Sequence, residues 1–240
     1  MKKRIFLATA LTLAGLGCSG IGFYSAAARQ ASPQPVELTA EPSHHLLFQN
    51  EYARVFNVEV APHTATLVHR HAYDYIYVTL GDTDLINEVV GKAPARLKLK
   101  DGEVRFAAGG FAHRAMNLAP TPFRNITVEI LKPNKEAKPA DEERGLDVGH
   151  GAMVETLFVQ DGVVAKDVTI NPRQALAIAS GGPQVLVALS RAELRDEGTD
   201  HASSEYHAER GDARWVAPRM NHRWRNVGAK PARFIMLEFF

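Results

Sequence analysis

The chain has 240 residues, of which 45% are hydrophobic and 23% are charged, and its formal net charge is +1. These values are typical of a globular protein with room for one large core or two cores of about 100 residues each. The sequence has no long basic run, which argues against a nucleic-acid partner.

The N-terminal segment differs from the rest of the chain. A basic start, KKR at 2–4, precedes the apolar stretch IFLATALTLAGLG, and small residues follow it up to Ala28. This order is typical of a secretory signal peptide, so we expect residues 1–28 to be removed after Ala28. The mature protein is then expected in the periplasm or outside the cell.

Cys18 keeps one alternative open. The sequence GLGC loosely resembles a bacterial lipoprotein box, so Cys18 could carry a lipid anchor. The apolar segment could also remain uncleaved as a membrane anchor. Cleavage after Ala28 is favoured over both alternatives. Cleavage after Ala28 removes the only cysteine and three positive charges, so the net charge changes from +1 to −2. A disulfide is therefore not expected.

The mature chain contains an internal repeat. Residues 47–62 resemble residues 157–172 at a shift of 110, and residues 101–117 resemble residues 210–226 at a shift of 109. We expect two domains, at residues 41–131 and 152–240, joined by a charged, proline-bearing linker at 132–151.

Within each repeat the segments are short and alternate between apolar and polar residues, as in VFNVEV at 55–60 and ITVEI at 126–130. This period of two, with glycine, proline, asparagine and aspartate between the segments, predicts antiparallel sheets in a sandwich or barrel. No long amphipathic helix is expected.

The stretch LVHRHAYDYIYVTLGD, at 67–82, carries the chemistry. On a strand His69 and His71 point to the same face, with Arg70 turned away. His113, which follows two glycines about forty residues later, could supply a third imidazole from a returning strand. Three neutral imidazoles on a rigid sheet suit a divalent transition metal.

These residues resemble the two motifs of the cupin superfamily. His69 and His71 match its His-x-His pair, Asp74 its acid and Gly81 the glycine that follows after six intervening residues. The second motif is matched by four residues at the right spacings: Gly102, Gly110, His113 and Asn117. The resemblance implies an all-β chain of two tandem jelly-roll barrels, a two-domain bicupin.

Asp74 departs from the pattern, because the family has Glu one or two positions later. Asp74 shares strand parity with Ile76 and Val78, so it could share an inward face with them, and Tyr75 would then face the other way. Asp74 therefore stays open as a fourth ligand or as a group that orients an imidazole. We expect Tyr75, Phe106 and Met116 to line the pocket.

The second copy retains only part of the motif. Ala179, Gly181 and Gln184 stand where the first copy has two histidines and the acid, and His222 matches His113. We expect His222 to be a vestigial residue in a domain that holds no metal. A second metal at His201, Glu205 and His207 is disfavoured, and His44 and His45 are expected on the surface.

The resemblance implies one divalent metal, Fe, Mn, Ni, Co, Cu or Zn, with open positions for a small organic molecule, and therefore a metal-dependent oxygenase or lyase. The competing hypothesis is a ligand-binding or accessory module with a structural metal or none. Catalytic residues beyond the metal ligands are not assigned, and a homo-oligomer stays open.

Overall fold

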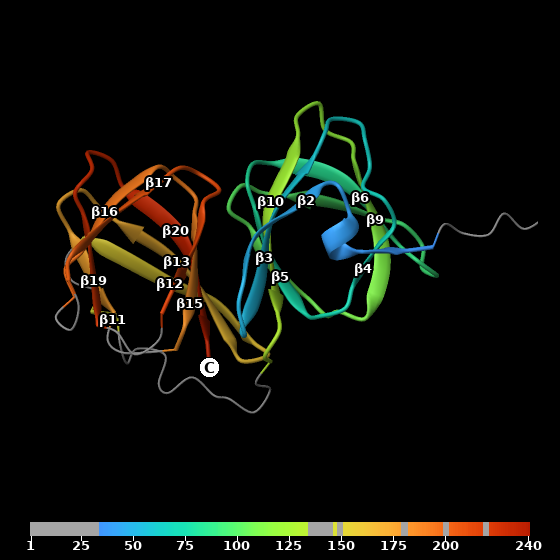
Figure 1. Ribbon diagram of the computed structural model, residues 1–240. Coiled ribbons are helices and arrows are strands. Elements are labelled where there is room, and N and C mark those ends of the chain that lie inside the picture. The colour runs from blue at the N-terminus through green and yellow to red at the C-terminus, as the bar shows by residue number, and fades with distance from the viewer. Residues whose placement is uncertain (1–33, 134–145, 148–150, 179–181, 199–201, 218–220) are drawn as a thin grey trace, which may run out of the picture. The chain divides into compact units, whose positions relative to one another are not determined.

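The computed structural model describes residues 34–133, 146–147, 151–178, 182–198, 202–217 and 221–240 (Figure 1). Within them the chain from Pro33 to Phe240 forms one compact unit. The expected signal peptide, Cys18 and most of the expected linker lie outside the described residues. In the described part, no helix is long and apolar enough to cross a bilayer.

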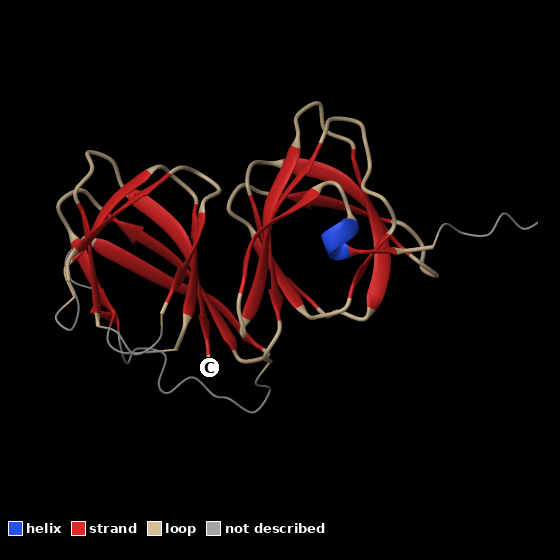
Figure 2. Ribbon diagram, viewed as in Figure 1, coloured by secondary structure: helices blue, strands red, loops and turns tan. Residues whose placement is uncertain are grey.

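The first half is built from ten strands and one short 3-10 helix, η1, which is the only helix that Figure 2 draws. Their bounds are β1 Val36–Glu37, η1 Leu38–Ala40, β2 His44–Gln49, β3 Ala53–Val60, β4 His69–His71, β5 Tyr75–Thr79, β6 Thr83–Val89, β7 Ala95–Leu99, β8 Val104–Ala107, β9 Phe111–Asn117 and β10 Phe123–Ile130.

The second half contains ten further strands in the residues that are described. Their bounds are β11 Leu146–Asp147, β12 Ala152–Gln160, β13 Val163–Ile170, β14 Ala175–Ile178, β15 Gln184–Ala188, β16 Ala192–Asp196, β17 Ser204–Ala208, β18 Ala213–Val216, β19 His222–Asn226 and β20 Ala232–Phe239. The strand β11 falls inside the range expected to be a linker.

The two halves have the same topology. The first half forms sheets of order β1-β4-β9-β6-β7 and β2-β3-β10-β5-β8, and the second half repeats both orders with each strand number raised by ten. One pairing differs, since β1 runs parallel to β4 whereas β11 runs antiparallel to β14. Two five-stranded sheets facing one another make each half a jelly-roll barrel, so the expected all-β fold is confirmed.

The repeat extends to single hydrogen bonds. Asn117, at the end of β9, donates from Nδ2 to the carbonyls of Val60 and Thr121, and Asn226, at the end of β19, donates to those of Ile170 and Lys230. Each asparagine also accepts a backbone N–H two residues later. The matched asparagines of the repeat thus close the same turn in both barrels.

We expect Asn226→Ala to lower the free energy of unfolding by about 3 kcal/mol, because it leaves buried backbone groups without partners. Urea unfolding of the mature protein measures this change. Val227→Ala, at the exposed neighbouring position, is the control and should change stability by less than about 0.5 kcal/mol. Equal effects of the two substitutions would contradict the assigned role.

Candidate metal centre

Strand β4 carries the histidine pair, and its residues alternate as the sequence predicts. His69 and His71 are 1% and 2% exposed, whereas Arg70 between them is exposed. The neighbouring strand β9 runs antiparallel with His113 directly opposite His69. The three histidines named from the sequence are therefore brought together on one face of one sheet.

A fourth histidine joins this group from the other sheet. His44 lies at the start of β2, opposite Val58 of β3, and is buried. Its ring centre is 4.7 Å from that of His69 and 6.2 Å from that of His71. The expectation that His44 lies on the surface is wrong.

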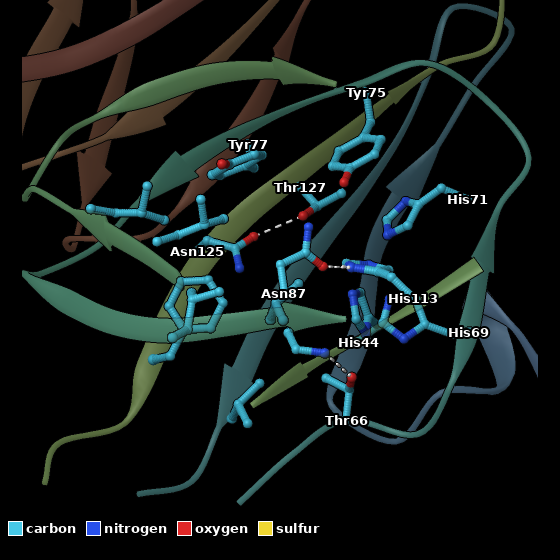
Figure 3. Close-up of a pocket in the computed structure, with 17 residues that line it drawn as sticks. His44, Thr66, His69, His71, Tyr75, Tyr77, Asn87, His113, Asn125 and Thr127 are labelled. Carbon is cyan, nitrogen blue, oxygen red and sulfur yellow. Dashed lines mark hydrogen bonds between the residues drawn. The ribbon is translucent and has the colours of Figure 1, made fainter. Parts of the chain in front are cut away.

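The four rings face one another in Figure 3. The centres of His69 and His113 are 4.5 Å apart, those of His71 and His113 5.1 Å, and those of His69 and His71 5.2 Å. One ligand atom from each of His44, His69 and His71 lies within 4.8 Å of the others. A metal-bound ring has its centre about 3.2 Å from the ion, so pairs of ligands have centres about 4.5 to 5.5 Å apart. The spacing among His69, His71 and His113 and that between His44 and His69 fit a metal, whereas the 6.2 Å between His44 and His71 exceeds this range.

Three of the rings have their Nδ1 atoms held by an oxygen acceptor. His44 Nδ1 lies 2.6 Å from Glu41 Oε2, His69 Nδ1 2.9 Å from the Leu67 carbonyl and His113 Nδ1 2.6 Å from Asn87 Oδ1. Each Nδ1 therefore carries a proton, and in the neutral rings of His69 and His113 Nε2 presents a lone pair. Among the described residues the buried Nε2 atoms of His69 and His113 have no hydrogen-bond partner.

Glu41 organises the edge of this group. Its buried carboxylate accepts hydrogen bonds from His44 Nδ1 and from the backbone N–H groups of Ser43 and Leu67. Leu67 in turn offers its carbonyl to His69 Nδ1. A single carboxylate thus fixes the ring of His44 and the backbone that orients His69.

His71 has different surroundings. Its ring stacks on Tyr75 with centres 4.0 Å apart, and its Nδ1 lies 4.0 Å from Glu129 Oε1. Burial raises the pKa of Glu129, and Arg54, whose Nε donates to Glu129 Oε2 at 2.7 Å, opposes that rise. Because burial also keeps His71 neutral, the 4.0 Å contact is not an ion pair.

Burial controls the charge of the cluster. It lowers the pKa of His69 to about 4, that of His113 to about 3 and that of His71 to about 2, and repulsion among the imidazoles adds to the effect. All three rings are therefore neutral at pH 7 and have lone pairs available for a cation.

The histidines line one end of a cavity of about 70 Å³. Asn87, Asn125, Thr127 and Tyr75 give it polar groups beyond the histidines. Thr66 and Tyr77 contribute two further hydroxyl groups. The remainder of the wall is apolar and is formed mainly by Val58, Val60, Leu85, Leu97, Leu99 and Phe123.

Asp74 does not line this cavity. It precedes β5, and its Oδ1 accepts the N–H of Gly109 at 2.7 Å, while Gly110 donates to the His71 carbonyl. A Cβ on Gly109 would lie 2.3 Å from the Tyr73 backbone, so only glycine fits there. Asp74 thus connects the segment between β4 and β5 to the loop that precedes β9.

Strand parity also places the expected pocket residues differently. Tyr75 lines the cavity, whereas Ile76 and Val78 face away from it and belong to another buried cluster. Phe106 lies opposite Ile76 and packs on that cluster, and Met116 alternates with the lining residue Ala115. Neither Phe106 nor Met116 lines the cavity, because each has the parity of the opposite face.

The second barrel has no equivalent histidine group among its described residues. His222 Nδ1 lies 2.6 Å from Asp196 Oδ2, and its ring stacks on Trp224. Of the positions that match the motif, Ala179 and Gly181 lie outside the described residues, and Gln184 is buried in β15. His207 is exposed and near Glu205, and His201 lies outside the described residues.

No family model and no curated protein matches the sequence. Among solved structures, an oxalate decarboxylase superposes with a TM-score of 0.57 and 13% identity over 79% of this chain and 69% of that chain. A structure of Bacillus subtilis oxalate decarboxylase, concerned with its Mn(II) centres, gives 0.56 and 12% over the same shares. A cupin 2 conserved barrel domain protein from Leptotrichia buccalis gives 0.53 and 7% over 82% and 88%. The fold is therefore that of two tandem cupin barrels.

We expect the metal-free protein to lose stability as the pH falls from 6.5 toward 5. In this window the unfolded chain binds protons at histidines whose folded pKa values lie at about 4 or lower, so proton binding stabilises the unfolded state relative to the folded state. The loss is as much as about 1.4 kcal/mol per pH unit for each histidine. Urea unfolding at several pH values measures the slope.

His71→Gln should reduce that slope, since it removes one of the titrating groups. His207→Gln, at an exposed histidine whose side chain is 68% accessible, should leave the slope unchanged. A free energy of unfolding that stays constant between pH 6.5 and 5 would show that the cluster is not buried in a neutral form.

Proposed function

We propose that this chain, which folds as two tandem cupin barrels, binds one divalent transition metal in its N-terminal barrel and acts as an exported, metal-dependent enzyme on a small organic molecule. The observation that carries the proposal is the group of four buried imidazoles, His44, His69, His71 and His113. Export rests on the sequence of residues 1–28 alone.

A purely structural role for these histidines is the competing interpretation. A structural histidine in a core normally has both ring nitrogens hydrogen-bonded, because an unpaired buried polar atom costs about 1 to 3 kcal/mol. His69 and His113 each use Nδ1 in this way and leave a buried Nε2 with no partner in the described structure. A cation bound by these Nε2 atoms would remove that cost.

The donor set bears on the metal. Imidazoles suit Fe, Ni, Cu and Zn, whereas Mn favours sites with carboxylate oxygens. Of the carboxylates near the histidines, Glu41 binds His44 Nδ1, and Glu129, which binds Arg54 through Oε2, has its Oε1 4.0 Å from His71 Nδ1 and outside the cavity lining. We therefore favour an imidazole-rich ligand set, with His44 in the place that an acid would occupy, and a metal other than the Mn(II) of the Bacillus subtilis enzyme.

A metal in this site would supply Lewis-acid chemistry or oxygen activation. The protein's own groups would orient the substrate, since the amides of Asn87 and Asn125 and the hydroxyl of Tyr75 face the cavity. Burial raises the pKa of Tyr75, which makes it a poor proton donor. Because the described lining contains no carboxylate and no lysine, an oxygenase reaction is better supported than a lyase reaction that needs a general acid.

The absence of a carboxylate and of a lysine from the described lining also supports a second candidate, a ligand-binding module in which the metal only anchors its ligand. The two candidates differ in turnover. Oxygen consumption or carbon dioxide release by the metal-loaded protein across a panel of small organic acids, enols and phenols would identify an enzyme, and saturable binding without any turnover would favour the module.

We expect the mature protein to retain about one equivalent of metal by elemental analysis, and His69→Ala/His71→Ala to retain less than a tenth of that. His222→Ala is the matched control, because it removes the equivalent histidine of the second barrel, and it should keep the metal. Loss of metal in neither variant, or no metal in the wild-type protein after loading with Fe, Mn, Ni, Co, Cu or Zn, would overturn the proposal.

Glu41→Gln should weaken metal binding about 10- to 100-fold, because the Glu41 carboxylate holds the Nδ1–H of His44. Competition with a chelator of known affinity measures the change. Glu37→Gln, at an exposed carboxylate four residues earlier, is the control and should bind metal as the wild-type protein does. Equal affinities in all three proteins would exclude His44 from the ligand set.

A further inference from the structure

We infer that the substrate of this site is a small molecule with one anionic head group that binds through oxygen, such as a carboxylate, enolate or phenolate, on an uncharged and mainly apolar body. The inference rests on the proposed metal site and names the class of molecule that the remaining cavity accepts. Its evidence is the distribution of polar and apolar groups along the wall.

The head group would lie at the histidine end. A divalent ion among neutral imidazoles keeps its full positive charge, since His69 and His113 donate from Nδ1 to oxygen acceptors and would bind the ion through Nε2. Such a site favours one anionic oxygen. Asn87 lies beside it, because its Oδ1 accepts from His113 Nδ1 and its amide N–H groups remain available to the ligand.

The body of the substrate would lie against hydrocarbon contributed by both sheets. Val58 and Val60 of β3 and Phe123 of β10 come from one sheet, and Leu85, Leu97 and Leu99 from the other. A polar patch between these walls is partly paired, since Thr127 Oγ1 donates to Asn125 Oδ1. Each methylene group buried on such a wall contributes an affinity gain of about fourfold.

A second charged group would meet no oppositely charged side chain in this cavity. Among the described residues, the lining contains no Lys, Arg, Asp or Glu. Arg70 lies on the exposed face of β4, and Arg105 and Arg114 form ion pairs with Glu103 and Glu88. A buried carboxylate without a cation or several hydrogen-bond donors is strongly disfavoured. A dicarboxylate is therefore a poor fit beyond the metal.

The size of the cavity limits the body to a few heavy atoms. A cavity of about 70 Å³ has room for about five waters on the measure in which one water needs about 15 Å³. The histidine and apolar ends share that space. We expect chains of up to about four carbons to fit.

Acetate, propanoate, butanoate and succinate test this inference on the full mature protein loaded with Co(II), with the visible absorption of the cobalt as the readout. Affinity should rise about threefold or more per added carbon from acetate to butanoate. Succinate, which matches butanoate in length but carries a second carboxylate, should bind at least tenfold more weakly than butanoate.

Leu97→Lys places a cation in the wall and should raise the affinity for succinate relative to butanoate by at least tenfold. Leu46→Lys makes the same change at a side chain that is 51% exposed and outside the lining, so it should leave the ratio unchanged. Circular dichroism of both variants checks that they fold.

Each outcome bears on a different statement. Equal affinities for succinate and butanoate in the cobalt-loaded protein, or affinities that do not depend on chain length, would overturn the inference about the substrate and leave the metal site intact. A protein that retains no cobalt or other metal by elemental analysis would overturn the proposed function and this inference with it.

Discussion

The site depends on the pairing of β4 with β9, which sets His69 directly against His113 inside a barrel. Antiparallel pairing brings opposite side chains within about 5 Å, so the two rings are adjacent before any ligand is present. Burial then keeps the rings neutral, and the acceptors Leu67 and Asn87 occupy their Nδ1 atoms. The pairing, the burial and the acceptors together leave two lone pairs pointing into one space, and His44 and His71 complete the group.

The second barrel shows what the same fold becomes without this constraint. By strand register, Trp224, Val154 and Phe234 of the second barrel occupy the positions that Ala115, His44 and Asn125 occupy in the first barrel. These large or apolar side chains pack in the core of the second barrel, with Trp224 only 1% exposed. The histidine with its acceptor is retained as His222 and Asp196. The first barrel therefore keeps its cavity through small and polar residues at positions where the second gains packing, which trades stability for a site.

Much of this arrangement could be predicted from the sequence, because the repeat and the two motifs depend on local spacing. The all-β fold, the two copies and the meeting of His69, His71 and His113 follow from strands of period two and matched segments. The face of β5 could not be assigned in this way. Both faces of β5 are buried, and Ile76 and Val78 are as apolar as the residues of the cavity wall. The sequence pattern therefore does not distinguish the face that lines the cavity from the opposite face. Phe106 and Met116 were consequently expected on the cavity face although they lie on the other one, and Asp74, which the pattern left open as a ligand, lies outside the lining.

His44 was missed for a different physical reason. The register of β2 against β3 shifts between Leu46 and Phe48, and β12 has the same shift between Thr156 and Phe158. Without such a bulge His44 and Phe48 would share a face, because they are four residues apart on a strand. With it Phe48 packs in the cluster that contains Ile76, and His44 faces the cavity. A bulge that occurs in both copies is a property of the repeat. The first barrel has a histidine at the position that it turns inward, and the second has a valine.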